Sequence, residues 1–314
     1  MTRRTFVQTT AAVPAMGMNA QAQPRKARIA ITLDLEMSRN FPAWETTHWD
    51  YEKGNLDEAA KRYSVEAARR VKARGGVIHF FVVGRVFEQE NIDWLKEIVA
   101  AGHKVGNHTY DHVYVLATKP DDVQYRFKRA PWLMRGRSVA EVIGDNVRMC
   151  TEAMQQRLGA HPVGFRTPGG FAEGIAGRYD VQRMLMDQGY GWISGKYPRH
   201  GIDRPEADYM PAALQAAQPY RYPETGLIEI PMSPVSDINA FRTGRWPLER
   251  FMKAVRYGVE WTIRNGAVYD LLAHPSCIGV VDPQFKTFDM ICDLVEQAKG
   301  AAEITDLDTI ARSV

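Results

Sequence analysis

Short apolar runs alternate with amphipathic segments along the chain from Lys26 onward. The run at 27–35 is rich in β-branched residues and predicts a buried strand, whereas the longer stretch at 139–158 predicts a helix. The same criteria predict strands at 77–83, 104–107, 162–166, 192–194, 227–230, 268–273 and near 303. They predict further helices at 64–74, 92–101, 179–187, 248–264 and 284–298.

This alternation predicts an α/β fold in which parallel strands are joined by helices. Seven or eight such units favour a closed (β/α) barrel. A doubly wound open sheet is the alternative, but no glycine-rich phosphate loop follows the first strand. The sequence shows no internal repeat and no linker, so we expect a single domain over residues 26–314.

Three long connections interrupt the alternation, at 37–56, 113–138 and 196–222. They are rich in Trp, Tyr, Arg and Pro, and long loops in compact domains usually carry a function. We therefore expect these connections to form the walls of a cleft.

Composition and charge narrow the class of protein. The 314 residues are 45% apolar and 25% charged, which is ordinary for a globular domain. The net charge of +3 falls to +1 once Arg3 and Arg4 are removed with an export signal, so nothing indicates a nucleic-acid partner. The three cysteines are widely separated and odd in number, so we expect buried thiols and not a disulfide framework.

Residues 1–22 resemble a twin-arginine export signal. Arg3 and Arg4 precede a weakly apolar stretch at 9–18, and Ala20-Gln21-Ala22 offers small residues at a cleavage point. The apolar stretch is too short for a membrane span. We expect export by the twin-arginine route to the periplasm or the outside of the cell; a disordered N-terminus is the alternative.

Reactive residue types stand at the ends of four predicted strands. Asp34, His108, Arg166 and His274 each lie at or just past the C-terminal end of a strand. In a parallel barrel these ends share one face, which is where active sites lie. The sequence therefore predicts an active site built from these residues.

His108 and His112 are four positions apart, so both imidazoles would point the same way if the segment continues as a helical turn. Glu36 from the first strand would bring the number of ligands to three. Three protein ligands plus water are typical of a catalytic zinc site. We therefore expect one divalent metal ion, zinc, bound by Glu36, His108 and His112, which would activate a water molecule.

Asp34 lies two positions before Glu36, and on a strand the two side chains point to the same face. We assign Asp34 as the base, held ionised by Arg166. The Gly169 amide could stabilise an oxyanion, and His274 would serve as the general acid for a leaving nitrogen.

These residues resemble the polysaccharide deacetylase family, also called the NodB-homology or carbohydrate esterase family 4 group. The resemblance covers nearly the whole chain after the export signal and keeps the motif order. It rests on Thr32-Leu33-Asp34-Leu35-Glu36, His79-Phe80-Phe81-Val82-Val83-Gly84, His108-Thr109-Tyr110-Asp111-His112, Arg166-Thr167-Pro168-Gly169-Gly170 and Leu271-Leu272-Ala273-His274.

The resemblance implies a distorted (β/α) barrel of about seven strands, a divalent metal and hydrolysis of N-acetyl groups on amino sugars. It implies that the first motif supplies the base and a metal ligand, that His108 and His112 bind the metal, and that His274 is the acid. The partner would be a carbohydrate polymer or oligosaccharide. The oligomeric state is not indicated.

Two motifs depart from the family pattern. Leu35 stands where the second Asp is usual, and the second acid, Glu36, comes one residue later, as in peptidoglycan deacetylase-like and cyclic-amide-hydrolysing branches. The stretch 190–194 stands where a further Asp is expected but contains none, so the partner of His274 stays unassigned. The alternatives are a hydrolase of a small cyclic amide or acetyl ester, and an inactive carbohydrate-binding homologue.

Overall fold

The strand β1 (Ala27–Leu35) lies inside a nine-stranded sheet that is almost entirely parallel. The structure is a computed structural model, and it describes residues 25–36, 53–203 and 209–314. The predicted export signal at 1–22 lies outside these ranges. Among the described residues, no helix is long and apolar enough to cross a membrane.

The strands are β1, β2 (Ile78–Val82), β3 (Lys104–Asn107), β4 (Gly164–Phe171), β5 (Trp192–Lys196), β6 (Tyr220–Arg221), β7 (Ile228–Glu229), β8 (Val268–Ala273) and β9 (Ala302–Ile304). Eight of the nine strands in the described residues were predicted from the sequence, whereas β6 lies in the predicted connection at 196–222 and was not. The helices are α1 (Glu58–Ala73), α2 (Asp93–Ala100), α3 (Pro120–Val123), α4 (Tyr125–Arg129), α5 (Val139–Leu158), α6 (Tyr179–Asp187), α7 (Pro211–Ala216), α8 (Leu248–Asn265), α9 (Pro275–Val281), α10 (Lys286–Gln297) and α11 (Leu307–Ala311).

The sheet curls so that its two ends approach each other. The strand order is β6-β7-β5-β4-β3-β2-β1-β8, with β9 added beside β1, and only β6 runs antiparallel to its neighbour. Just after β7, Ser233 forms a parallel bridge with Leu271 of β8, and its amide donates to the Asp270 carbonyl at 2.9 Å. The predicted single-domain α/β fold with a distorted barrel is confirmed.

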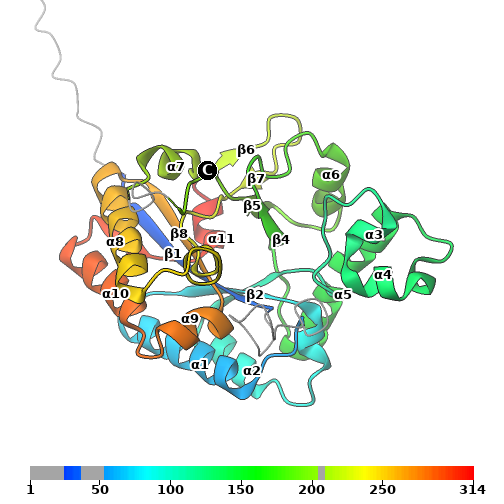
Figure 1. Cartoon of the computed structure of the whole chain (residues 1–314), viewed down its shortest axis with the longest axis horizontal. Coiled ribbons are helices and arrows are strands. Elements are labelled where there is room, and N and C mark those ends of the chain that lie inside the picture. Colours follow the sequence, from blue (N-terminus) through cyan, green and yellow to red (C-terminus); the bar gives the residue numbers. More distant parts are fainter. Residues whose placement is uncertain (1–24, 37–52, 204–208) are drawn as a thin grey trace, which may run out of the picture.

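Helices cover the outside of the curled sheet (Figure 1). The longest, α5, has the bounds that the sequence predicted, because local signals fix both of its ends. Ser138 and Glu141 form a reciprocal capping box, and Gly159 ends the helix with a φ of 65°. Helix α1 instead begins six residues before its predicted start, where the Asp57 side chain accepts from the Ala60 amide.

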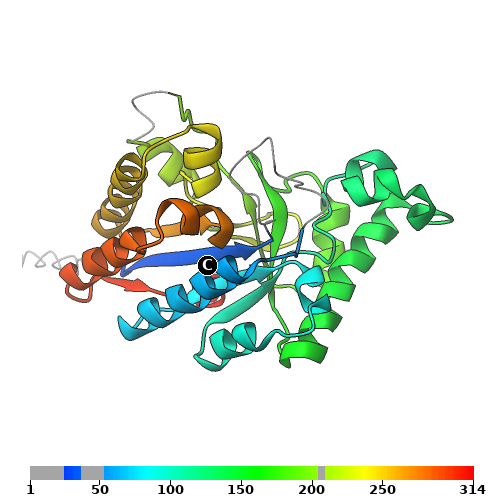
Figure 2. The same cartoon turned by 60° about the horizontal axis from the view of Figure 1, so that its bottom comes forward.

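The predicted loop at 113–138 contains short helices in the structure. Helices α3 and α4 are followed by a 3-10 turn at Pro131–Met134, and together they form a lobe at the periphery of the molecule (Figure 1, Figure 2). Helices of four and five residues do not show the repeated apolar positions by which longer helices are predicted.

Side-chain alternation along β1 divides an apolar outer face from a polar inner face. Ile29, Ile31 and Leu33 belong to the core that packs against the helices. Thr32 and Asp34 point into the barrel, where they contact buried polar groups. The strand thus contributes to the core and to the site at the same time.

Candidate active site

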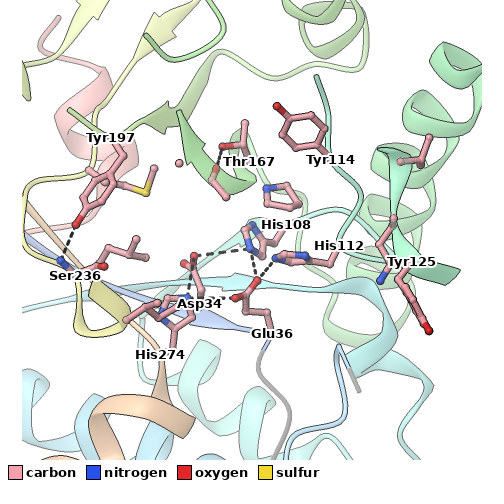
Figure 3. A pocket seen from close by; sticks show the side chains of 18 of the residues that line it. Asp34, Glu36, His108, His112, Tyr114, Tyr125, Thr167, Tyr197, Ser236 and His274 are labelled. Atoms are coloured by element: carbon pink, nitrogen blue, oxygen red, sulfur yellow. Dashed lines mark hydrogen bonds and ion pairs between the residues drawn. The ribbon is translucent and has the colours of Figure 1, made fainter. Parts of the chain in front are cut away.

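A cavity of about 710 Å³ lies at the C-terminal ends of the strands. Of the predicted site residues, Asp34, Glu36, His108, His112, Gly169 and His274 line it, and Arg166 is completely buried beside Asp34. Figure 3 shows the carboxylates and the three imidazoles pointing toward one another. The structure therefore brings all seven predicted residues together at the end of the barrel where they were expected.

The two histidines reach this point from an irregular turn, because the segment after β3 is not helical. Thr109 and His112 have positive φ values of 59° and 58°. Side chains replace the missing helical hydrogen bonds: Asn107 Oδ1 accepts from the Thr109 amide at 2.7 Å, and Thr109 Oγ1 accepts from the Val113 amide at 2.9 Å. The helical turn considered from the spacing is thus wrong, although the two rings do lie side by side, 5.0 Å apart.

The donor atoms of Glu36, His108 and His112 all lie within 4.8 Å of one another. His108 Nε2 lies 3.0 Å from Glu36 Oε2, and His112 Nε2 faces the same oxygen. His108 Nδ1 lies 2.9 Å from the carbonyl of Arg166, to which it can donate, and this leaves the Nε2 lone pair for the cavity. Two imidazoles and a carboxylate directed at one point fit a divalent cation.

Charges around Glu36 keep it ionised. Burial alone would raise the pKa of its carboxyl, but His112, Lys53 and a hydrogen bond with His108 hold that pKa well below the usual value. Lys53 is fully buried, and its Nζ lies 3.0 Å from Glu36 Oε1, on the oxygen that does not face the histidine pair. Burial lowers the pKa of His112 to about 4, which leaves a neutral ring suited to bind a metal.

Asp34 is held by an arginine that crosses the barrel interior. Arg166 Nη1 lies 3.0 Å from Asp34 Oδ1 and 2.7 Å from the Thr32 hydroxyl. Its Nη2 contacts Asp270 Oδ2 at 2.5 Å and Ser194 Oγ at 3.0 Å. Burial raises the pKa of Asp270 to about 6, against the opposing effect of Arg166. No role was predicted for Asp270 from the sequence. An acidic residue inside the apolar run of β8 nevertheless indicates that its carboxylate is paired with a buried polar or charged group.

The partner of His274 is Asp237, which comes from the segment after β7. Asp237 Oδ1 lies 2.9 Å from His274 Nδ1, and its Oδ2 accepts from the His274 amide at 2.7 Å. Burial would lower the pKa of His274, but Asp237 outweighs it and raises that pKa to about 10. The Nε2 atom points into the cavity, 3.3 Å from Glu36 Oε1 and 4.0 Å from Asp34 Oδ2.

Two of the long connections supply walls of the cavity, as predicted. Tyr114 and Tyr125 come from the connection at 113–138 and stand on one side, while Tyr197 stands on the other (Figure 3). The Tyr197 hydroxyl accepts from the Ser236 amide at 2.8 Å. Residues 37–52 of the first connection lie outside the described part of the chain.

Fold and site together define an α/β-barrel protein with a mixed imidazole and carboxylate centre. Residues 54–183 match the polysaccharide deacetylase family model. This match confirms the predicted resemblance to that family, but not the particular Asp34-Leu35-Glu36 form of its first motif. The matched segment includes His108, His112 and Arg166, whereas Asp34 and His274 lie outside it.

Solved structures with the same fold are distant in sequence. A Mycobacterium smegmatis protein assigned as a polysaccharide deacetylase is 16% identical, with a TM-score of 0.62 over 98% of this chain and 95% of its own. Puue allantoinase is 14% identical, with a TM-score of 0.60 over 96% and 97%. A Pseudomonas aeruginosa PAO1 protein assigned as a polysaccharide deacetylase is 15% identical, with a TM-score of 0.60 over 91% and 89%. No curated protein matches this chain at a significant level.

Proposed function

We propose that this protein is a metal-dependent hydrolase that removes N-acetyl groups from amino sugars of a peptidoglycan- or chitin-like polysaccharide. The observation that carries the proposal is that three sets of side chains meet in one cavity. They are the Glu36, His108 and His112 donors, Asp34 held by Arg166, and His274 held by Asp237.

Each group has a place in amide hydrolysis. A zinc ion held by Glu36, His108 and His112 would supply a Lewis acid that makes water a better nucleophile at neutral pH. Asp34 takes a proton from the attacking water, and Arg166 keeps the carboxylate oriented. The Gly169 amide donates to the developing oxyanion. His274 gives a proton to the leaving amine nitrogen, so that water and the N-acetyl group become acetate and a free amine.

The shape of the cavity supports a polymeric substrate. It is open to the surface and has tyrosines on opposite walls, and Tyr114 and Tyr125 remain about 40% exposed. Exposed aromatic rings beside a reaction centre suit stacking against sugar rings on both sides of the scissile group. A small cyclic amide would use only the inner part of such a cleft.

Elemental analysis of the purified protein combined with a substrate screen tests the proposal. We expect about one zinc ion at the Glu36 site, which Glu36→Ala removes, and acetate release from chito-oligosaccharides or peptidoglycan fragments. Acetyl xylan and allantoin are the comparison substrates, because they represent an acetyl ester and a cyclic amide. Activity on allantoin alone would replace the proposed substrate. No activity on any of them, with no metal bound, would favour an inactive carbohydrate-binding protein.

We also propose that the chain is exported by the twin-arginine route to the periplasm or beyond. The support is the order of Arg3-Arg4, a weakly apolar stretch and Ala20-Gln21-Ala22. Replacing Arg3 and Arg4 by lysine should leave the protein in the cytoplasmic fraction, whereas an unchanged distribution would contradict this route.

A further inference from the structure

A second group of possible metal ligands lies at the opposite end of the barrel from the active site. His79 is near the start of β2, and Asp306 and Asp308 begin helix α11. One donor atom from each residue lies within 4.8 Å of the others. Leu307 and Ile310 of α11 pack in one apolar cluster with Phe81, so this helix is held against the same end of the barrel.

His79 is the residue in this group that lacks hydrogen-bond partners. It is 1% exposed, and neither of its ring nitrogens has a hydrogen-bond partner. The ring is held firmly, stacked on Phe81 at 4.8 Å and edge-on to Trp192 at 5.4 Å. A buried polar ring without partners is costly, which indicates that something else completes its bonding. Burial lowers the pKa of His79 to about 4, so its ring is neutral and can offer a lone pair.

Each of the two carboxylates also accepts hydrogen bonds within the protein. Asp306 caps α11: its Oδ1 accepts from the Thr309 amide and its Oδ2 from the Thr309 hydroxyl, both at 2.9 Å. Asp308 Oδ1 accepts from Trp192 Nε1 at 2.9 Å. Each carboxylate oxygen keeps a second lone pair, and among the described residues no Lys, Arg or His forms an ion pair with either acid. In the part of the chain that the structure describes, the two acids therefore have no ion-paired cation.

We propose that His79, Asp306 and Asp308 form a second divalent-cation site, structural in role, at the base of the barrel. One imidazole and two carboxylates suit Zn²⁺ or Mn²⁺, with water filling the remaining positions. The ion would complete the bonding of His79 and neutralise the two acids. It would also tie α11 to β2, since the ligands come from both elements. Asp308 is partly exposed, which gives the ion a path from solvent.

Metal counting in variants tests this site. The full chain is stripped with a chelator, incubated with Zn²⁺, desalted and measured by elemental analysis. Asp308→Asn keeps an oxygen for Trp192 but removes the charge, and we expect it to bind one ion fewer than the wild type. His79→Phe, which keeps an aromatic ring between Phe81 and Trp192, should lose the same ion. Asp293→Asn is the matched control, because Asp293 is an exposed acid paired with Arg74.

The Glu36→Ala background separates the two sites. In this variant Zn²⁺ should still raise Tm, by about 5 °C at a hundred times Kd, and the rise should vanish when Asp308→Asn is added. Asp308→Asn and His79→Phe proteins that hold as much zinc as the wild type would overturn the proposal and leave a buried water as the occupant. Because the ion is counted directly, this outcome is independent of whether the Glu36 site is catalytic.

Discussion

Asp34 and Glu36 are two buried carboxylates only two positions apart, and each has its own positive neighbour. Arg166 holds Asp34, while Lys53 lies beside Glu36. Like charges this close would otherwise raise each other's pKa. Separate partners allow one acid to bind a metal and the other to remain a free base.

The division of roles between these two acids can be tested by substituting each of them separately. Asp34→Asn should retain nearly normal bound zinc and lose turnover by at least about 100-fold, because a general base is removed. Glu36→Ala should lose the zinc ion of the active site. Elemental analysis and acetate release on the same samples check both expectations. If Asp34→Asn loses the zinc while Glu36→Ala keeps it, the two assignments are reversed.

Asp237 is a positioning residue that acts through His274. Asp237→Asn keeps one acceptor oxygen but removes the charge beside His274 Nδ1, so we expect kcat to fall about 100-fold with KM and bound zinc nearly unchanged. Steady-state kinetics with metal analysis measures this split. A matching rise in KM, or a large loss of Tm, would instead indicate a purely structural role.

Single elements were predicted well where local signals fix their ends. Helices α5 and α6 and strands β3 and β8 have their predicted bounds. The strand-end residues of the site followed from the same strands, since parallel strands present their C-terminal ends together. Asp237 was not predictable in this way, because its segment follows β7 without any periodic pattern and its pairing with His274 spans 37 positions. The lobe of α3 and α4 was missed because its helices are too short.

This lobe should matter for long substrates. Tyr125 lines the cavity, whereas Trp132 lies in the same lobe, is 70% exposed and does not line it. Tyr125→Ala should raise KM for a chito-oligosaccharide about 5- to 10-fold, as the loss of one aromatic contact implies. Trp132→Ala is the control and should leave KM unchanged. Equal effects of the two variants would argue against a substrate path along the Tyr125 wall.

At the scale of the whole molecule, Arg166 of β4 contacts residues of four other strands across the barrel. Its side chain comes from β4 and contacts Asp34 of β1, Ser194 of β5 and Asp270 of β8, and it stacks on Phe81 at 4.2 Å. The sequence predicted a barrel and the contact with Asp34. It could not show this convergence, which depends on how the sheet curls.

Removing this arginine should destabilise the fold. Arg166→Met leaves two buried acids without their cation, so we expect a loss of about 3–5 kcal/mol in the free energy of unfolding. Arg69→Met breaks an exposed ion pair with Glu97 and should cost less than about 1 kcal/mol. Urea unfolding of both variants gives the comparison, and similar small losses would contradict the structural role of Arg166.

The hydrogen bond between His108 Nδ1 and the carbonyl oxygen of Arg166 has a consequence for redesign. His108 is oriented by a main-chain oxygen, while Asp34 is oriented by the side chain of the same residue. Exchanging the side chain at this position therefore releases Asp34 but leaves the anchor of the imidazole in place. In a variant of this protein that is stable enough to tolerate a substitution of Arg166, the reactivity of Asp34 could be changed without altering the metal ligands.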